Sequence, residues 1–249
     1  MEKIKDQPSV NTKPQKVSDD SVRGQKITRI KTGIPGFDDL VEGGFVTGSI
    51  NLISGDAGTN KSIFSMQFVV NGIIKYNEPG VYVSFEQTKQ NVYDEMLVFG
   101  WDLKKLEDEG KFIFLEYTPE QVDNVIRTGG GIIADVIQSI KAKRLAIDSL
   151  TALTSLYDSS QKRREELLKL FNLIRKWDCT AILIAENAQS IERHNTLEAD
   201  YEVDSEIDIY TQRTIKEGEK ILEVYKMRAT KHSTYMHKIT VGPKGLLIK

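Results

Sequence analysis

The stretch 55–62 constrains the fold of this chain more than any other part of the sequence. It begins at Gly55, ends at Lys61 and Ser62, and lies between an apolar run over 50–53 and a helical pattern of apolar residues over 64–73. A strand, a glycine-rich turn and a helix in this order form a phosphate-binding loop. Backbone N–H groups of such a turn point into one concavity, where the helix dipole also favours negative charge. The sequence therefore predicts a site for the phosphates of a nucleotide.

The residues of this loop have separate predicted roles. Lys61 is expected to place its ammonium on the β- and γ-phosphates, and Ser62 to offer its hydroxyl to Mg²⁺. The other candidate phosphate-binding residues are Gly55, Asp56, Ala57, Gly58, Thr59 and Asn60. The motif normally has glycine where this chain has Asn60. Asparagine is the residue after glycine that best tolerates a left-handed backbone, so the loop is expected to form.

The composition is that of an ordinary soluble protein. The 249 residues are enough for one sizeable α/β domain, and 28% of them are charged, 39% are hydrophobic and the net charge is −2. No apolar run approaches the roughly 18 residues of a membrane helix, and the N-terminus lacks the apolar segment of a signal peptide. We expect a cytoplasmic protein with a disordered polar tail over 1–25 and one domain over 26–249.

Strands and helices are predicted to alternate over most of the domain. Strands are expected at 48–54, 80–85, 111–115, 144–148 and 180–185, with helical patterns between them. This order gives an α/β fold with a mostly parallel central sheet flanked by helices. Strands expected at 207–214, 221–228 and 236–241 follow with little helix between them, so the C-terminal end is predicted to be antiparallel.

Three predicted strands end in an acid. Asp148 stands where an aspartate that holds Mg²⁺ belongs, and Glu86 is the first candidate for a group that orients or deprotonates the attacking water. Glu86 follows the strand that we expect to neighbour the phosphate-loop strand. Because ligands bind beyond the carboxyl ends of parallel strands, Glu86, Asp148 and Glu186 are expected to converge there.

Several further motifs occur in one order along the chain. They are 32–38 (TGIPGFD), 84–86 (SFE), 99–103 (FGWDL), 147–153 (IDSLTAL) and 226–228 (KMR), the last followed by Thr230 and His232. With these motifs the chain resembles a single KaiC-type ATPase domain of the RecA/RadA superfamily, as in archaeal single-domain relatives, over 27–248. The resemblance implies a P-loop NTPase of RecA type with ATP and Mg²⁺ as cofactors.

The resemblance also implies an assembly. Similar domains form rings, commonly hexamers, that bind ATP between subunits, and they act together with a protein partner that these residues do not identify. Lys226 and Arg228 would then reach the γ-phosphate in the neighbouring subunit, with Met227, Thr230 and His232 near the same nucleotide. An arginine delivered by a neighbour neutralises transition-state charge only in the assembled ring.

Three positions depart from the family pattern, and they bear on the predicted rate. Gln87 replaces a second glutamate after Glu86, Asn60 replaces the loop glycine, and Ala229 replaces a common glycine after the arginine. The first two favour slow turnover. We therefore expect a slow Mg-dependent ATPase that acts as a nucleotide-state switch in signalling or regulation. A non-hydrolysing ATP-gated scaffold and a recombinase-like DNA-binding ATPase are the alternatives.

The segment after the fifth strand argues against nucleic acid as a partner. Its acids, with Arg193 as the one arginine among them, are Glu186, Glu192, Glu198, Asp200, Glu202, Asp204, Glu206 and Asp208. Binding to a polyanion needs lysine and arginine facing the phosphates. An acidic loop here does not suit a channel that tracks a DNA strand.

Overall fold

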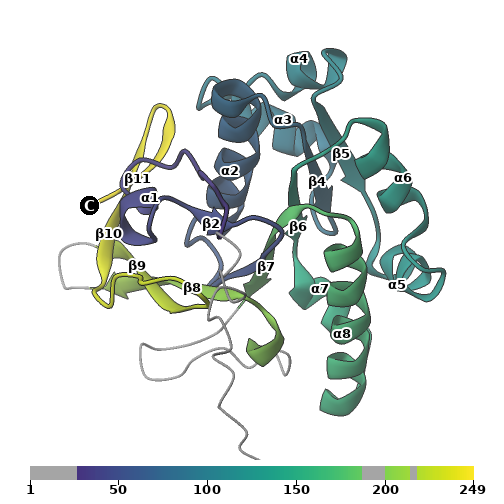
Figure 1. The fold of residues 1–249 in the computed structure, drawn as a ribbon. Coiled ribbons are helices and arrows are strands. Elements are labelled where there is room, and N and C mark those ends of the chain that lie inside the picture. The colour runs from purple at the N-terminus through teal and green to yellow at the C-terminus, as the bar shows by residue number, and fades with distance from the viewer. Residues whose placement is uncertain (1–26, 187–199, 214–217) are drawn as a thin grey trace, which may run out of the picture.

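The computed structural model of the chain describes residues 27–186, 200–213 and 218–249 (Figure 1). The predicted disordered tail over 1–25 lies outside the described residues. Within them the main sheet has nine strands in the order β11-β10-β9-β8-β3-β7-β6-β4-β5, and a two-stranded sheet pairs β1 with β2. No helix of this described part is both long and apolar enough to cross a membrane.

The main sheet is parallel through its centre and antiparallel at one end. Its parallel strands are β3 (Ile50–Gly55), β4 (Gly80–Ser84), β5 (Phe112–Glu116), β6 (Arg144–Asp148), β7 (Thr180–Glu186) and β8 (Ser205–Arg213). The antiparallel end, which β8 joins through its second edge, consists of β9 (Gly218–Met227), β10 (His237–Gly242) and β11 (Gly245–Ile248). The predicted fold class is therefore confirmed.

Helices cover both faces of the sheet (Figure 1). The elements outside the main sheet are α1 (Phe37–Leu40), α2 (Lys61–Tyr76), α3 (Lys89–Leu97), α4 (Leu103–Asp108), α5 (Pro119–Arg127), α6 (Gly131–Ser139), α7 (Leu150–Thr154), α8 (Ser160–Lys176), a 3₁₀ turn at Asp200–Glu202, β1 (Arg29–Ile30) and β2 (Phe45–Val46). Successive strand residues pack on opposite faces. Ile53 joins one apolar core with α2 to α4, and Leu52 joins the other with α5 to α8.

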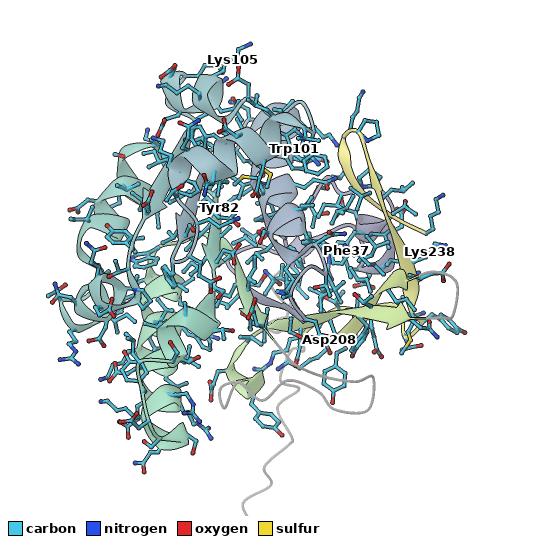
Figure 2. All side chains as sticks on the ribbon, turned by 180° about the vertical axis from the view of Figure 1, so that it is seen from behind. Phe37, Tyr82, Trp101, Lys105, Asp208 and Lys238 are labelled. Atoms are coloured by element: carbon cyan, nitrogen blue, oxygen red, sulfur yellow. The ribbon has the colours of Figure 1, made fainter. Side chains whose placement is uncertain are left out.

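Figure 2 shows how the side chains divide between the core and the surface. Phe37 and Tyr82 lie inside the packed body and are almost fully buried, whereas Lys105 and Lys238 project at its periphery. Asp208 lies on β8 and is also buried, at 2% exposure. A carboxylate this deep has to be hydrogen-bonded within the protein, so Asp208 is not part of the solvent-facing acidic loop that the sequence predicts.

One prediction about strand neighbours is wrong. The strand that precedes Glu86, β4, does not lie beside β3, because β7 and β6 occupy the two places between them. The connection from β3 through α2 to β4 crosses over these places, and later parts of the chain fill them. All of these strands nevertheless end at the same edge of the sheet, so Glu86 still reaches the phosphate loop from a more distant strand.

Candidate functional site

The phosphate loop joins β3 to α2 through residues whose backbone few side chains allow. A Cβ on Gly55 would lie 2.3 Å from the carbonyl oxygen of Ile209 on the adjacent β8, so only glycine fits there. Gly58 has φ 78° and Asn60 has φ 78° and ψ 23°, both in the left-handed region. The expectation that asparagine replaces glycine by adopting this conformation is confirmed. Helix α2 begins at the next residue, Lys61.

Lys61 is buried inside the loop. Its Nζ donates hydrogen bonds of 2.8 Å to the carbonyl oxygens of both Gly55 and Asp56. Burial lowers the pKa of Lys61, an effect that the carboxylates of Glu186 and Asp148 partly offset. Charged phosphate oxygens are stronger acceptors than neutral carbonyls. The ammonium can therefore exchange its two carbonyl partners for the phosphates of a nucleotide.

Asp148 lies at the end of β6 directly beside the first turn of α2. Ser62 Oγ donates a 2.7 Å hydrogen bond to Asp148 Oδ2, and the hydroxyl of Tyr82 donates a second one of 2.8 Å to the same oxygen. Burial raises the pKa of Asp148, and these two hydroxyl donors act in the opposite direction. The structure thus brings together the two residues predicted to hold Mg²⁺.

The chemistry of this donor set fits Mg²⁺. A hydroxyl and a carboxylate are hard oxygen ligands, and Mg²⁺ in proteins is usually held by one or two such groups with waters and substrate phosphates. Within residues 27–186, 200–213 and 218–249, no cluster of three or more His, Cys, Asp or Glu side chains forms a metal site by itself. Ser62 and Asp148 would hold the ion together with the phosphates of a bound nucleotide.

Glu86 lies two residues beyond the end of β4 and faces the same site. Ser84 of β4 pairs with Asp148 of β6, which places these two strand ends side by side. Ser149 Oγ donates a 2.9 Å hydrogen bond to Glu86 Oε1 and so fixes one carboxylate oxygen. Glu186 ends β7 opposite Gly55 of the loop. The three acids predicted to converge therefore meet at one edge of the sheet.

These groups surround a cavity of ≈ 270 Å³. It is lined by loop residues 57–63 and by Ser84, Glu86, Gln87, Asp148, Ser149, Ile184 and Glu186. We call it the phosphate cavity. Gln87 stands in its wall, and its backbone N–H donates to Ser84 Oγ at 3.0 Å. The residue that departs from the family pattern after Glu86 is therefore part of the site.

The second group of predicted site residues is not among those lining this cavity. We call 226–232, at and beyond the end of β9, the basic segment. The Arg228 guanidinium donates to the carbonyl oxygen of Tyr201, and its backbone N–H donates to that of Asp204 at 2.8 Å. Arg228 is exposed, whereas Met227 is buried and pairs with Ser205 of β8.

The other members of the basic segment have partners of their own. Lys226 lies opposite Glu206 in the pairing of β9 with β8. Thr230 Oγ1 accepts a 2.9 Å hydrogen bond from Arg29 of β1, and His232 Nδ1 lies 3.0 Å from the carbonyl oxygen of Ser233. The structure separates these residues from the phosphate loop of their own chain.

Sequence reasoning missed two hydroxyl groups that contact the acids of the site: that of Ser149, which lines the phosphate cavity, and that of Tyr82, which is not one of its lining residues. Tyr82 reads as an apolar strand residue, and Ser149 as a small residue after the acid of β6. Signals for both were present: Ser149 adjoins Asp148, and Tyr82 precedes Ser84 by the two positions that put side chains on the same face of a strand. Each hydroxyl donates to a carboxylate of the site, Tyr82 to Asp148 and Ser149 to Glu86.

The predicted acidic loop after β7 is wrong for three of its members. Asp204 Oδ2 accepts a 2.9 Å hydrogen bond from the Ile50 N–H, and Glu206 and Asp208 are buried in β8 at 2% exposure each. Ser54 Oγ donates to Asp208. These three acids are structural because they lie in or against the sheet. Glu192 and Glu198, also counted in that loop, lie outside the described residues.

Comparisons with known proteins agree with this geometry. A family model described as "ATPase: KaiC" matches residues 30–249. The circadian clock oscillator protein KaiC of Synechococcus elongatus is 36% identical over 235 residues, which cover 90% of this chain and 44% of that protein. The circadian clock protein KaiC3 of Synechocystis is 34% identical over 233 residues, which cover 89% of this chain and 46% of that protein. The chain thus spans less than half the length of these relatives.

A solved structure matches over almost its whole length. The KaiC-like protein from the hyperthermophilic archaeon Pyrococcus horikoshii OT3 is 35% identical, with a TM-score of 0.79, and the match covers 90% of this chain and 99% of that one. The likeness therefore extends over the sheet, the phosphate cavity and the basic segment together.

Proposed function

The chain belongs to the KaiC family of ATPases, and from this membership we propose that it is a slow Mg²⁺-dependent ATPase that works as a ring. ATP binds at the phosphate cavity of one subunit and meets the basic segment of the next. The nucleotide state of the ring acts as a switch in signalling or regulation, through a protein partner. The cytoplasmic location expected from the sequence is part of this proposal.

One observation carries the proposal of magnesium–nucleotide chemistry. Ser62 and Asp148 are far apart in the sequence, yet Ser62 Oγ donates a 2.7 Å hydrogen bond to Asp148 Oδ2 beside the first turn of α2. A helix N-terminus after a glycine-rich turn favours phosphate, and a hydroxyl with a carboxylate beside it suits the accompanying Mg²⁺. Bound Mg²⁺ neutralises negative charge that develops on the transferred phosphoryl group.

The residues of the chain then have defined tasks. The loop N–H groups and Lys61 bind and orient the phosphates. Glu86, held by Ser149, accepts a hydrogen bond from the attacking water and takes up its proton. Lys226 and Arg228 of the neighbouring subunit neutralise charge on the γ-phosphate, and Met227, Thr230 and His232 line the same interface.

The wall of the phosphate cavity supports slow turnover. Glu86 is the carboxylate that Ser149 holds, and the position after it carries the neutral amide of Gln87. An amide takes up no proton at neutral pH, so of these two neighbouring positions only Glu86 can accept a proton from the water. The same feature supports the second candidate function, a scaffold that binds ATP and assembles with almost no hydrolysis.

Phosphate release from Mg·ATP, measured beside the variant Lys61→Ala, tests the proposal. We expect slow release by the parent and a loss of about 100-fold or more in the variant, because the phosphates lose their charged partner. Light scattering with and without ATP reports the assembly state of each protein. Release by the parent that does not exceed the Lys61→Ala background, with assembly retained, would replace the ATPase by the scaffold. A parent that neither binds Mg·ATP nor assembles contradicts both.

A further inference from the structure

A lysine from a distant strand contacts the phosphate loop of its own chain. Lys220 lies on β9, opposite Thr211 of β8 and Ile239 of β10. Its Nζ donates a 2.7 Å hydrogen bond to Oδ1 of Asn60, from which it is separated by 160 positions in the sequence. Lys220 is half-buried, and burial lowers its pKa. Removing a long charged side chain from water is unfavourable unless a partner compensates, and here the partner is the loop amide.

The contact falls on the position where this chain departs from the loop pattern. Asn60 holds the left-handed conformation, and its carbonyl oxygen accepts the hydrogen bond from the Phe64 N–H that opens α2. Glycine at this position would offer no side chain to hold. In this chain, the ammonium group of Lys220, which lies outside the loop, holds Asn60, the residue that joins the loop to α2.

The chemistry of the pair also orients the amide. An ammonium group only donates, so Oδ1 of Asn60 faces Lys220 and Nδ2 faces away from it. Among the described residues this Nδ2 is buried and has no hydrogen-bond partner. Asn60 lines the phosphate cavity, whereas Lys220 is not one of its lining residues. Asn60 therefore lies between Lys220 and the cavity, and it is the group through which Lys220 contacts the phosphate loop.

We propose that Lys220 is a positioning residue for nucleotide binding that acts through Asn60. It holds the left-handed residue of the loop in the orientation that the cradle of N–H groups needs, and its charge polarises the amide toward bound phosphates. This inference rests on the proposed function, since it adds to Lys61 a second lysine of the same chain that acts on the nucleotide site. In this chain, the Asn60–Lys220 pair takes the place of the glycine that the loop motif normally has at position 60.

A double-mutant cycle on the whole 249-residue chain tests the inference. The Kd for Mg·ATP is measured by calorimetry for the parent, Lys220→Met, Asn60→Gly and the double variant. We expect Lys220→Met to raise the Kd of the parent about 10-fold, because binding must then also order the loop residue that the lysine holds in the free protein. In the Asn60→Gly background the same change should alter the Kd less than about 2-fold. Lys220→Arg should recover most of the affinity.

Lys238→Met is the matched control. Lys238 lies on the adjacent strand β10 opposite Ile221, is exposed, and pairs with Glu219 at 2.5 Å (Figure 2). Removing it changes the net charge by the same amount, and the Kd should stay that of the parent. Thermal unfolding without nucleotide distinguishes a role in nucleotide binding from a purely structural role. A purely structural role would lower the Tm of Lys220→Met in both backgrounds and leave the Kd unchanged.

The outcomes are distinct. An unchanged Kd in Lys220→Met overturns the inference while the proposed function stands, because the parent still binds Mg·ATP. An equal loss with and without Asn60 also overturns it, since the charge would then act without the amide. A parent that binds no Mg·ATP removes the proposed function and the inference together.

Discussion

The phosphate cavity and the basic segment hold the two halves of the predicted site, and they differ in how complete they are within one chain. In the cavity, charged and polar side chains meet one another: Ser62 and Tyr82 donate to Asp148, and Ser149 donates to Glu86. In the basic segment, Arg228 is exposed and its guanidinium donates to a backbone carbonyl of the same chain.

This difference shows which part of the chemistry one subunit can supply. Binding phosphates and Mg²⁺ and positioning a water need groups that converge on one concavity, and the residues proposed for these tasks lie together at the ends of β3, β4 and β6. The cations of the basic segment are not lining residues of that cavity. Tyr225 and Tyr235 near the segment are 43% and 76% exposed, so their side chains are accessible to the subunit contact that the proposed ring requires.

The largest expected effect is that of Arg228→Ala on turnover. If the arginine acts on the nucleotide of a neighbour, its loss should slow ATP hydrolysis roughly 10³-fold, as for an arginine delivered in trans, with Mg·ATP still bound. Phosphate release and calorimetric binding measure the two properties separately. A loss of binding equal to the loss of turnover contradicts a role confined to the transition state.

Mixing sharpens this prediction. Lys61→Ala subunits keep Arg228, and Arg228→Ala subunits keep the phosphate loop, so a mixed ring contains some interfaces with both groups intact. Activity should reappear when the two inactive variants are mixed. If both groups acted within one subunit, no mixture would recover activity, and the contrast between the cavity and the basic segment would disappear.

Glu86→Gln tests the cavity half by itself. We expect turnover to fall on the order of 10²-fold, the usual contribution of a positioned general base, because the amide no longer takes up a proton. Mg·ATP binding and assembly should stay close to those of the parent, and mixing with Arg228→Ala should again restore interfaces. Gln87→Glu is the informative companion: if the missing second acid limits the rate, this change should raise turnover.

Local patterns in the sequence were enough to predict most of the phosphate cavity. The loop, the strand before it and the left-handed Asn60 follow from residues within a few positions of one another. Acids at strand ends meet because parallel strands end at the same edge of a sheet, so Glu86 and Asp148 could be placed together without knowing the order of the strands.

What could not be predicted depends on pairings between distant segments. The order of the strands is one case, since nothing local to 80–84 tells that β7 and β6 separate it from β3. Glu206 and Asp208 are another, because buried acids in a strand have the same sequence appearance as a solvated acidic loop until their partners are known. The contact of Lys220 with Asn60 is a third.

The smallest expected effect concerns the backbone at the two regions. The left-handed positions of the phosphate loop carry Gly58 and Asn60, whereas the basic segment places Ala229 at φ 53°. A left-handed alanine costs roughly 1–2 kcal/mol, and glycine costs roughly 0.5–1 kcal/mol more entropy on folding. Ala229→Gly should therefore raise the free energy of unfolding by about 0.5–1 kcal/mol in urea titrations.

Ala134→Gly is the matched change at a helical position, in α6, and should lower the same free energy by about 0.5–1 kcal/mol. Opposite signs for the two substitutions would show that strain at Ala229, and not glycine content, sets the result.

Arg29 donates to the carbonyl oxygen of Ala229 at 3.1 Å and to Thr230 Oγ1, so neighbouring contacts hold this strained residue in place. Backbone strain that neighbouring contacts maintain is found mostly at functional sites, where the local backbone conformation contributes to the function. If Ala229→Gly stabilises the chain and slows phosphate release by the assembled protein, the strained alanine keeps the basic segment in the conformation that acts on the nucleotide of the neighbouring subunit. If it stabilises the chain with the rate unchanged, contacts such as those of Arg29 alone hold the segment.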